Sequence, residues 1–148
     1  MLKLNVNNET SRLLVVVLGT AKSNGITPKI DDCYDPMSRQ NILNQTYPSE
    51  NDMIDEMNQF KQVLYKYDID IIRPSIINDY NQIFSRDIGF VIDDYFIISN
   101  ILPQRSREIL AIEKVLVQIP KNKIIELPEE CCIEGGDVVL HNLSLIHI

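Results

Sequence analysis

The sequence lacks a long apolar run. No stretch of its 148 residues approaches the ~20 consecutive apolar residues that a membrane-spanning helix needs. Residues 1–12 also lack the basic and then apolar pattern of a secretory signal. We therefore expect a cytoplasmic protein with no membrane partner.

Cysteine is also scarce. The three thiols are Cys33, Cys131 and Cys132, an odd number in which two are adjacent. Adjacent cysteines pair poorly with each other and do not have the spacing of a metal site. The sequence predicts reduced thiols and no metal centre.

Basic residues are outnumbered, with 14 Lys and Arg against 21 Asp and Glu, which gives a formal net charge of -7. A chain of this charge, with its basic residues dispersed, offers little attraction to a polyanion, so nucleic acid is excluded as a partner. The hydrophobic share of 45% is ample for one globular unit with a core.

The first half of the chain predicts a strand, a long loop, a helix and a strand. Residues 13–18 are continuously apolar and stop at Gly19, which is typical of a strand buried on both faces. Residues 19–48 then form a loop that is either a lid or an insertion at the rim. Ser49 and Asp52 predict a capping box. It opens a helix whose apolar positions are Met53, Met57, Phe60, Leu64 and Tyr67, and residues 69–72 form a strand before Pro74.

The second half repeats this order. Residues 90–92 and 95–98 predict a hairpin, and a helix ending at Pro120 follows, with Ile109, Ile112, Leu116 and Ile119 on its apolar face. A strand over residues 123–127 closes the unit. Asp87 and Asp137 are 50 residues apart, and each precedes an apolar strand. This period predicts two repeat units and the first strand of a third.

Residues 143–148 are expected to be foreign to the fold. The hexamer Leu-Ser-Leu-Ile-His-Ile resembles a translated sequencing adapter, although a genuine terminal strand is the alternative. We therefore assign residues 1–142 to one partial α/β domain and residues 143–148 to a non-native tail.

Polar clusters precede strands or open a helix at related places in the two units. Asp87 lies in Phe-Ser-Arg-Asp, Arg105 in Arg-Ser-Arg-Glu, and Glu134 and Asp137 in Glu-Gly-Gly-Asp. Equivalent loops of a ring of repeats converge, so Asp87 and Glu134 are expected to face one pocket and to hold a guanidinium, which needs carboxylates in its plane. Gly135 and Gly136 would let the backbone pass close to the ligand. Taken singly, each cluster is also compatible with a surface ion pair, a tight turn or a solvated helix end.

These motifs resemble those of the amidinotransferase and arginine deiminase superfamily over residues 4–142. The opening segment, residues 8–19, is similar to the first strand of amidinotransferases. The resemblance implies the five-bladed α/β propeller of the pentein fold. It implies that Asp87 binds the substrate guanidinium, that Arg105 binds the substrate carboxylate, and that Glu134 has a catalytic role by orienting a histidine. Asp137 is a second candidate for substrate binding.

The resemblance also implies a mechanism without metal or organic cofactor. A cysteine attacks the guanidinium carbon, a histidine protonates the leaving amine, and the covalent intermediate passes to an amine or to water. In the family both groups follow the region that this sequence matches. His141, His147, Cys131 and Cys132 do not match their positions and receive no catalytic role.

The expected function is therefore that of an amidinotransferase-like enzyme acting on arginine or a related guanidine, represented by an N-terminal fragment. An arginine deiminase or a dimethylarginine hydrolase of the same superfamily is the alternative within the enzymes. A non-catalytic guanidine-binding module is the alternative outside them. Assembly into a homo-oligomer is left open.

Overall fold

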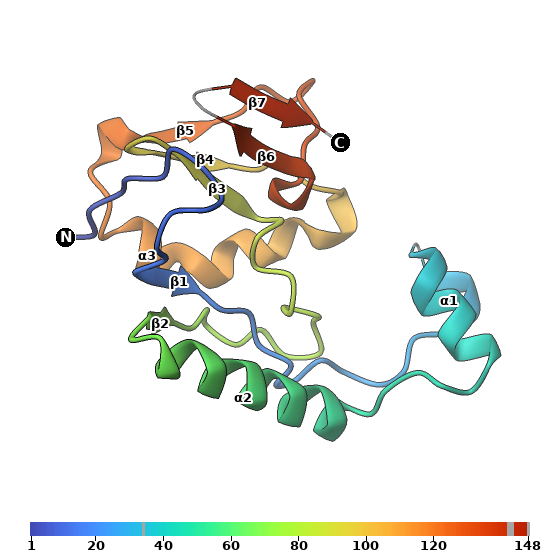
Figure 1. Cartoon of the computed structure of the whole chain (residues 1–148). Coiled ribbons are helices and arrows are strands. Elements are labelled where there is room, and N and C mark those ends of the chain that lie inside the picture. The colour runs from blue at the N-terminus through green and yellow to red at the C-terminus, as the bar shows by residue number, and fades with distance from the viewer. Residues whose placement is uncertain (34, 142–143, 148) are drawn as a thin grey trace.

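The structure is a computed structural model that describes residues 1–33, 35–141 and 144–147 (Figure 1). The strands are β1 (Val15–Val17), β2 (Asp70–Ile72), β3 (Gly89–Ile92), β4 (Tyr95–Ile98), β5 (Ile124–Glu126), β6 (Val138–His141) and β7 (Ser144–His147). The α-helices are α1 (Pro36–Leu43), α2 (Glu50–Lys66) and α3 (Glu113–Leu116). The 3-10 helices are η1 (Ile30–Asp32), η2 (Pro103–Ile112), η3 (Lys121–Lys123) and η4 (Gly135–Asp137).

The strands form three small sheets. β1 pairs in parallel with β2, and α2 makes the crossover between them. β3 and β4 form an antiparallel hairpin, and β5 joins β4 in parallel after η2 and α3. β6 and β7 form a further antiparallel pair. The predicted α/β class and the strand–helix–strand order are confirmed, and within the described residues no sheet closes on itself.

The capping box at the start of α2 is confirmed. The Ser49 hydroxyl accepts a hydrogen bond from the Asp52 amide at 3.2 Å, and the Asp52 carboxylate accepts one from the Ser49 amide at 3.2 Å. The predicted apolar face of this helix is only partly buried. Leu64 packs with Leu18 and Ile69, whereas the side chain of Phe60 is exposed. The other exposed position of that face is Tyr67.

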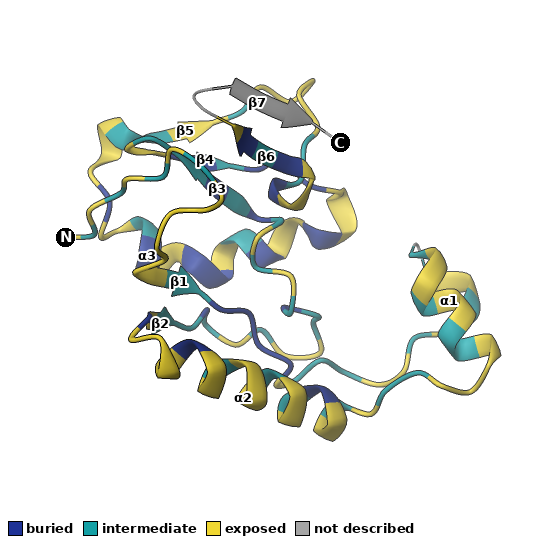
Figure 2. Cartoon of the chain, in the orientation of Figure 1, coloured by how far each residue is buried: buried dark blue, intermediate teal, exposed yellow. Residues whose placement is uncertain are grey.

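The prediction that residues 13–18 form a strand buried on both faces is wrong for most of this segment. Leu14 is 62% exposed and Val15 is 40% exposed, whereas Leu18 is buried. Among the described residues, β2 is the strand that pairs with β1, and Leu13, Leu14 and Val15 are exposed. Figure 2 shows exposed chain leading into β1. A continuous apolar run indicates that a segment prefers to be buried, but it does not show which neighbouring element covers it.

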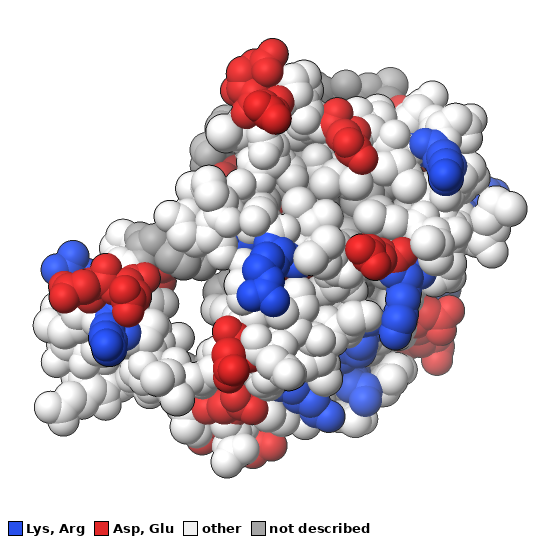
Figure 3. Space-filling model, turned by 180° about the vertical axis from the view of Figure 1, so that it is seen from behind, with Lys and Arg blue, Asp and Glu red and all other residues white. Residues whose placement is uncertain are grey.

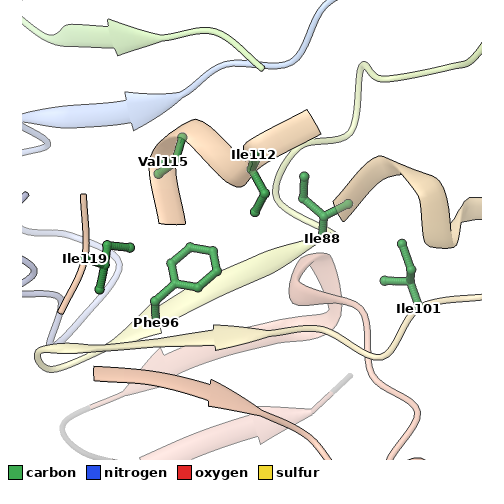
Figure 4. Close-up of a cluster of buried hydrophobic side chains, with 6 residues drawn as sticks. All are labelled: Ile88, Phe96, Ile101, Ile112, Val115 and Ile119. Atoms are coloured by element: carbon green, nitrogen blue, oxygen red, sulfur yellow. The ribbon is translucent and has the colours of Figure 1, made fainter. Parts of the chain in front are cut away.

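The second predicted helix divides into η2 and α3, and its inner face forms the main core. Ile112 and Val115 point from this segment toward Phe96 of β4 (Figure 4). Val17 of β1 and Ile72 of β2 pack against the same cluster, so the helical segment lies between two sheets. The buried members of the cluster are Ile88, Phe96, Ile101, Ile112, Val115 and Ile119. The observed buried face differs from the predicted one by a rotation about the helix axis. Ile109 and Leu116, which were predicted to be on the buried face, are half-buried at its edge.

The long loop contains a helix that the sequence analysis missed. α1 begins after Asp35, whose carboxylate accepts hydrogen bonds from the amides of Met37 and Ser38, and Pro36 occupies its first position. α1 stands apart from the sheets and buries none of its residues (Figure 1). Its role as a lid or as a rim insertion stays a prediction.

The backbone of residues 144–147, inside the suspected tail, pairs with β6 as β7. Residues 142, 143 and 148 lie outside the described residues, so the predicted boundary after residue 142 is not tested. Strand pairing alone does not distinguish a native strand from a foreign one.

Within the part of the chain that the structure describes, no helix is both long and apolar enough to cross a membrane. Acidic and basic side chains are interspersed over the face shown in Figure 3, without a broad basic patch on that face. This distribution agrees with the dispersed charge expected from the sequence.

Ile112→Ala should lower the free energy of unfolding by about 2 to 5 kcal/mol, because Ile112 is 2% exposed and the truncation leaves a cavity. Leu110→Ala is the matched control on the same segment, since Leu110 is 56% exposed and its loss should change stability by less than about 0.5 kcal/mol. Urea unfolding of both variants measures the difference. Equal effects would contradict the assigned core face.

Candidate functional site

Asp87 lies in a turn that is fixed against the end of β1. The hydroxyl of Ser85 donates a hydrogen bond to the carbonyl oxygen of Val17 at 2.7 Å. Gly19 allows a close approach, because a β-carbon there would lie 2.0 Å from the carbonyl oxygen of Ile83. The turn that carries Asp87 is therefore positioned by the first strand before β3 begins.

Glu134 lies in a second loop that packs directly on the first. The amide of Gly135 donates a hydrogen bond to the carbonyl oxygen of Asp87 at 3.1 Å. A β-carbon at Gly135 would lie 2.2 Å from the Arg86 carbonyl oxygen, and one at Gly136 would lie 2.4 Å from Asp87 Oδ1. Gly135 and Gly136 were expected to let the backbone pass close to a ligand. In the structure they let the backbone pass close to the neighbouring loop, at Arg86 and Asp87.

Arg86 ties the two loops to the N-terminal segment. Its Nε donates to the carbonyl oxygen of Gly135 at 2.9 Å, and its Nη2 donates to that of Val138 at 2.8 Å. Nη2 also lies 3.0 Å from Glu9 Oε1, which accepts a hydrogen bond from the Leu140 amide at 3.2 Å. Partial burial alone would raise the pKa of Glu9, but the hydrogen bonds from Arg86 and Leu140 lower it overall.

Arg105, on η2, lies between the two loops and bridges them. Its Nη1 donates to Asp87 Oδ2 at 2.9 Å and to Glu134 Oε2 at 3.1 Å. Its Nε and Nη2 bind the two carboxylate oxygens of Glu108 at 2.7 and 3.0 Å, an end-to-end pair with two parallel hydrogen bonds. The ring centre of Phe84 lies 5.9 Å from the guanidinium carbon. We call Asp87, Arg105, Glu108 and Glu134 the carboxylate cluster.

The carboxylate cluster has a buried pair, Arg105 and Glu108, and two half-buried loop carboxylates, and it has excess negative charge. Arg105 is 6% exposed and Glu108 is 4% exposed. Burial alone would lower the pKa of Arg105, but the hydrogen bonds to Glu108 and Asp87 raise it overall. Burial raises the pKa of Glu108, against the opposing effect of Arg105. Three carboxylates face one guanidinium, so with all groups ionised the cluster favours a further cation.

In each of the two loop carboxylates, Asp87 and Glu134, only one oxygen is hydrogen-bonded to Arg105. Arg105 takes Asp87 Oδ2 and Glu134 Oε2. Glu134 Oε1 is buried and has no hydrogen-bond partner among the described residues. A buried carboxylate oxygen without a donor is costly, so this oxygen is available to a donor that the described residues do not supply.

Three of the four predicted site residues thus meet in the structure: Asp87, Arg105 and Glu134. Asp137 is exposed at the end of η4, and its amide donates to the Glu134 carbonyl oxygen. Four of the five N–H groups of Arg105 are engaged by carboxylates, so a substrate carboxylate would find one left.

Glu108 was missed by the sequence analysis, although its spacing could have revealed it. The buried positions of this segment alternate in steps of three and four and continue the apolar stripe into charged residues: Arg105, Glu108, Ile112, Val115 and Ile119. A charged pair on the buried face of a helix predicts that its members bind each other.

An apolar surface hollow of about 390 Å³ lies in a different part of the molecule. It is lined by Phe90, Ile92, Ile97, Leu127, Cys131, Cys132 and Ile133. No member of the carboxylate cluster lines it. The exposed thiols of Cys131 and Cys132 therefore lie beside an apolar surface and not in the candidate site.

Comparison with known proteins identifies the fold by structure and not by sequence. No family model matches the sequence, and no curated protein matches it. Solved structures of two amidinotransferases and of a dimethylarginine dimethylaminohydrolase (DDAH) do share its fold. The resemblance inferred from the motifs is confirmed at the level of the fold.

The individual similarities are as follows. An inosamine-phosphate amidinotransferase from Streptomyces griseus matches with a TM-score of 0.69 at 15% identity, over 97% of this chain and 54% of the other. An amidinotransferase of saxitoxin biosynthesis from Microseira wollei matches with a TM-score of 0.64 at 15% identity, over 93% and 52%. DDAH from Pseudomonas aeruginosa, complexed with citrulline, matches with a TM-score of 0.51 at 18% identity, over 62% and 37%. The chain spans about half the length of the two amidinotransferases.

The lowered pKa of Glu9 predicts a pH-dependent contribution to stability. The ionised carboxylate stabilises the fold above the ordinary value of 4.5, and this contribution is lost as the pH falls through the lower folded-state pKa. Glu9→Gln should lower the free energy of unfolding at pH 7 by up to about 1 kcal/mol, because its ion pair with Arg86 is partly exposed.

The difference between Glu9→Gln and the unchanged chain should shrink as the pH is lowered below 4.5, as measured by urea unfolding at a series of pH values. Glu126→Gln, at an exposed position of β5, is the control and should have little effect at any pH. A difference for Glu9→Gln that stays constant down to pH 3 would contradict the assignment.

Proposed function

We propose that this chain is the N-terminal part of a guanidino-group-modifying enzyme of the amidinotransferase type, acting on arginine or a related guanidine. The observation that carries the proposal is that Asp87 and Glu134 converge on one guanidinium, that of Arg105, with negative charge to spare. The shared fold with two amidinotransferases and DDAH supports it.

Asp87 is proposed to bind the substrate guanidinium. Its Oδ2 is held by Arg105, which leaves Oδ1 for a second guanidinium. A guanidinium presents N–H groups in a rigid plane, and a carboxylate oxygen fixed by its neighbours meets them without reorganising. Asp137 stays proposed as a second carboxylate for the substrate, three residues after Glu134.

Glu134 is proposed to hold a histidine through Oε1, the buried oxygen without a donor. An imidazole N–H would satisfy this oxygen, and the carboxylate would in turn favour the protonated ring. The histidine then gives its proton to the leaving amine while a cysteine thiolate forms a bond to the guanidinium carbon. An acceptor amine, or water, afterwards displaces the thiolate.

The histidine and the cysteine are proposed to come from the part of a longer protein that this chain does not span, in which the repeat units close into a five-bladed propeller. Residues 1–142 would belong to that propeller and residues 143–148 would not. The same proposal includes a cytoplasmic location and leaves assembly into a homo-oligomer open. The transferase and the hydrolase differ in the acceptor, which these residues do not select.

The 148-residue chain alone should show no turnover of arginine, because carboxylates cannot form the covalent intermediate without a nucleophile. The protein translated from the uninterrupted genomic reading frame should turn over arginine and contain a histidine and a cysteine beyond Asn142. Steady-state assays of product formation with both proteins measure this. Activity of the short chain that disappears in Cys131→Ala or Cys132→Ala would contradict the proposal, and a natural stop after Asn142 would favour a binding module.

In the longer protein, Asp87→Asn and Glu134→Gln should separate binding from proton transfer. Asp87→Asn should lower kcat/KM by about 10²-fold and raise KM, because a buried charged contact to the substrate is lost in both the ground and the transition state. Glu134→Gln should lower kcat by about 10²-fold with a smaller change in KM. It should also move to lower pH the limb on which activity falls as the histidine loses its proton, since the histidine loses an anionic neighbour and its pKa falls.

Asp94→Asn and Glu126→Gln are the matched controls, because both carboxylates are exposed and belong to the same sheet region. They should leave kcat and KM unchanged. Activity near that of the unchanged protein in Asp87→Asn or in Glu134→Gln would remove the altered residue from the site.

A further inference from the structure

We propose that Glu108 and Arg105 form a positioning pair that holds Asp87 and Glu134 at the spacing needed for a guanidinium, and that Arg105 does not bind the substrate carboxylate. This inference rests on the proposed function for its enzymatic test, but the contacts that carry it do not. It assigns a role to Glu108 and replaces the role that the motif resemblance implies for Arg105.

Arg105 is held toward the core and not toward the outside. Glu108 binds Nε and Nη2 from the inner side, at 2.7 and 3.0 Å, and this face of η2 belongs to the core. The side chain of Glu108 is 5% exposed. If Arg105 turned outward to a ligand carboxylate, it would leave a buried carboxylate without its counter-charge, which is strongly unfavourable.

Nη1 of Arg105 joins the two loops. This nitrogen donates to Asp87 Oδ2 and to Glu134 Oε2, one oxygen of each loop. Two carboxylates on one nitrogen would otherwise repel each other, and the cation between them fixes their separation. The oxygens that face away from Arg105 are the ones assigned above to the substrate and to the histidine.

Glu108 also sets the charge balance of the cluster. With Asp87 and Glu134 alone, Arg105 would cancel half of the negative charge that attracts a guanidinium. Glu108 offsets Arg105, so the pair contributes geometry while the two loop carboxylates keep their formal charge for the ligand. A neutral donor at position 105 would not offset the repulsion between the two loop carboxylates. A cation at position 105 without Glu108 would reduce the negative charge that attracts a cationic substrate.

The test compares two probes in the longer protein: arginine, and arginine amide, which keeps the guanidinium and lacks the carboxylate. Arg105→Lys keeps the charge but loses the fork of donors, and Glu108→Gln removes the counter-charge. Each variant should lower kcat/KM by on the order of 10²-fold for both probes alike, because the loop carboxylates are displaced. Glu108→Asp, which keeps the charge, should recover part of the loss.

Arg107→Lys and Glu113→Gln, at exposed positions of the same segment, should leave kcat/KM unchanged for both probes. A loss in Arg105→Lys that is confined to arginine and spares arginine amide would overturn the proposal and restore Arg105 as the carboxylate ligand. An unchanged kcat/KM in Glu108→Gln would also overturn the proposal, because Glu108 would then have no positioning role.

A second measurement uses the 148-residue chain and does not depend on enzymatic activity. If the longer protein turns over neither probe, the proposed function is refuted, and this measurement still tests the positioning pair. The side-chain carboxylate carbons of Asp87 and Glu134 are observed by ¹³C NMR. Their resonances should shift in Glu108→Gln and stay in place in Glu113→Gln, with circular dichroism confirming that both variants fold. Unchanged resonances in Glu108→Gln would show that the pair does not position the loops.

Discussion

The buried guanidinium of Arg105 is the interaction on which the rest of the site depends. It contacts three carboxylates that come from three different places in the chain: Asp87 before β3, Glu108 on η2 and Glu134 before η4. Three buried or half-buried acids would not converge without a cation, because their desolvation and mutual repulsion oppose it. The charge of Arg105 therefore allows the loops to meet, and the three carboxylates leave the cluster with excess negative charge.

The arrangement of the sheets and the helical segment supplies the scaffold for this meeting. Each loop precedes a strand of a different sheet, and the helical segment that carries Arg105 and Glu108 packs between the β1–β2 pair and the sheet of β3, β4 and β5. Gly135 and Gly136 let one loop press on the other, and Arg86 joins both to Glu9. The fold thereby brings to one point residues that are 47 positions apart in the sequence, from Asp87 to Glu134.

The sequence predicts local structure well where the chain itself determines it. The capping box at Ser49 and the hairpin around Asp93 follow from local motifs. The convergence of Asp87 and Glu134 is a long-range contact that was expected from the related positions of their motifs. The sequence predicts burial less well, because Leu14 and Phe60 are apolar but lack a neighbour to cover them among the described residues. It does not predict the contacts of Arg105 with Glu108, since the sequence alone does not show which carboxylate lies beside a buried arginine.

The most direct test of the account is a crystal structure of the longer protein with bound arginine. The account predicts the ligand guanidinium at Asp87 Oδ1, a histidine nitrogen at Glu134 Oε1, and Arg105 still held by both oxygens of Glu108. A ligand guanidinium bound away from Asp87 and Glu134, with Oε1 of Glu134 facing no histidine, would contradict it.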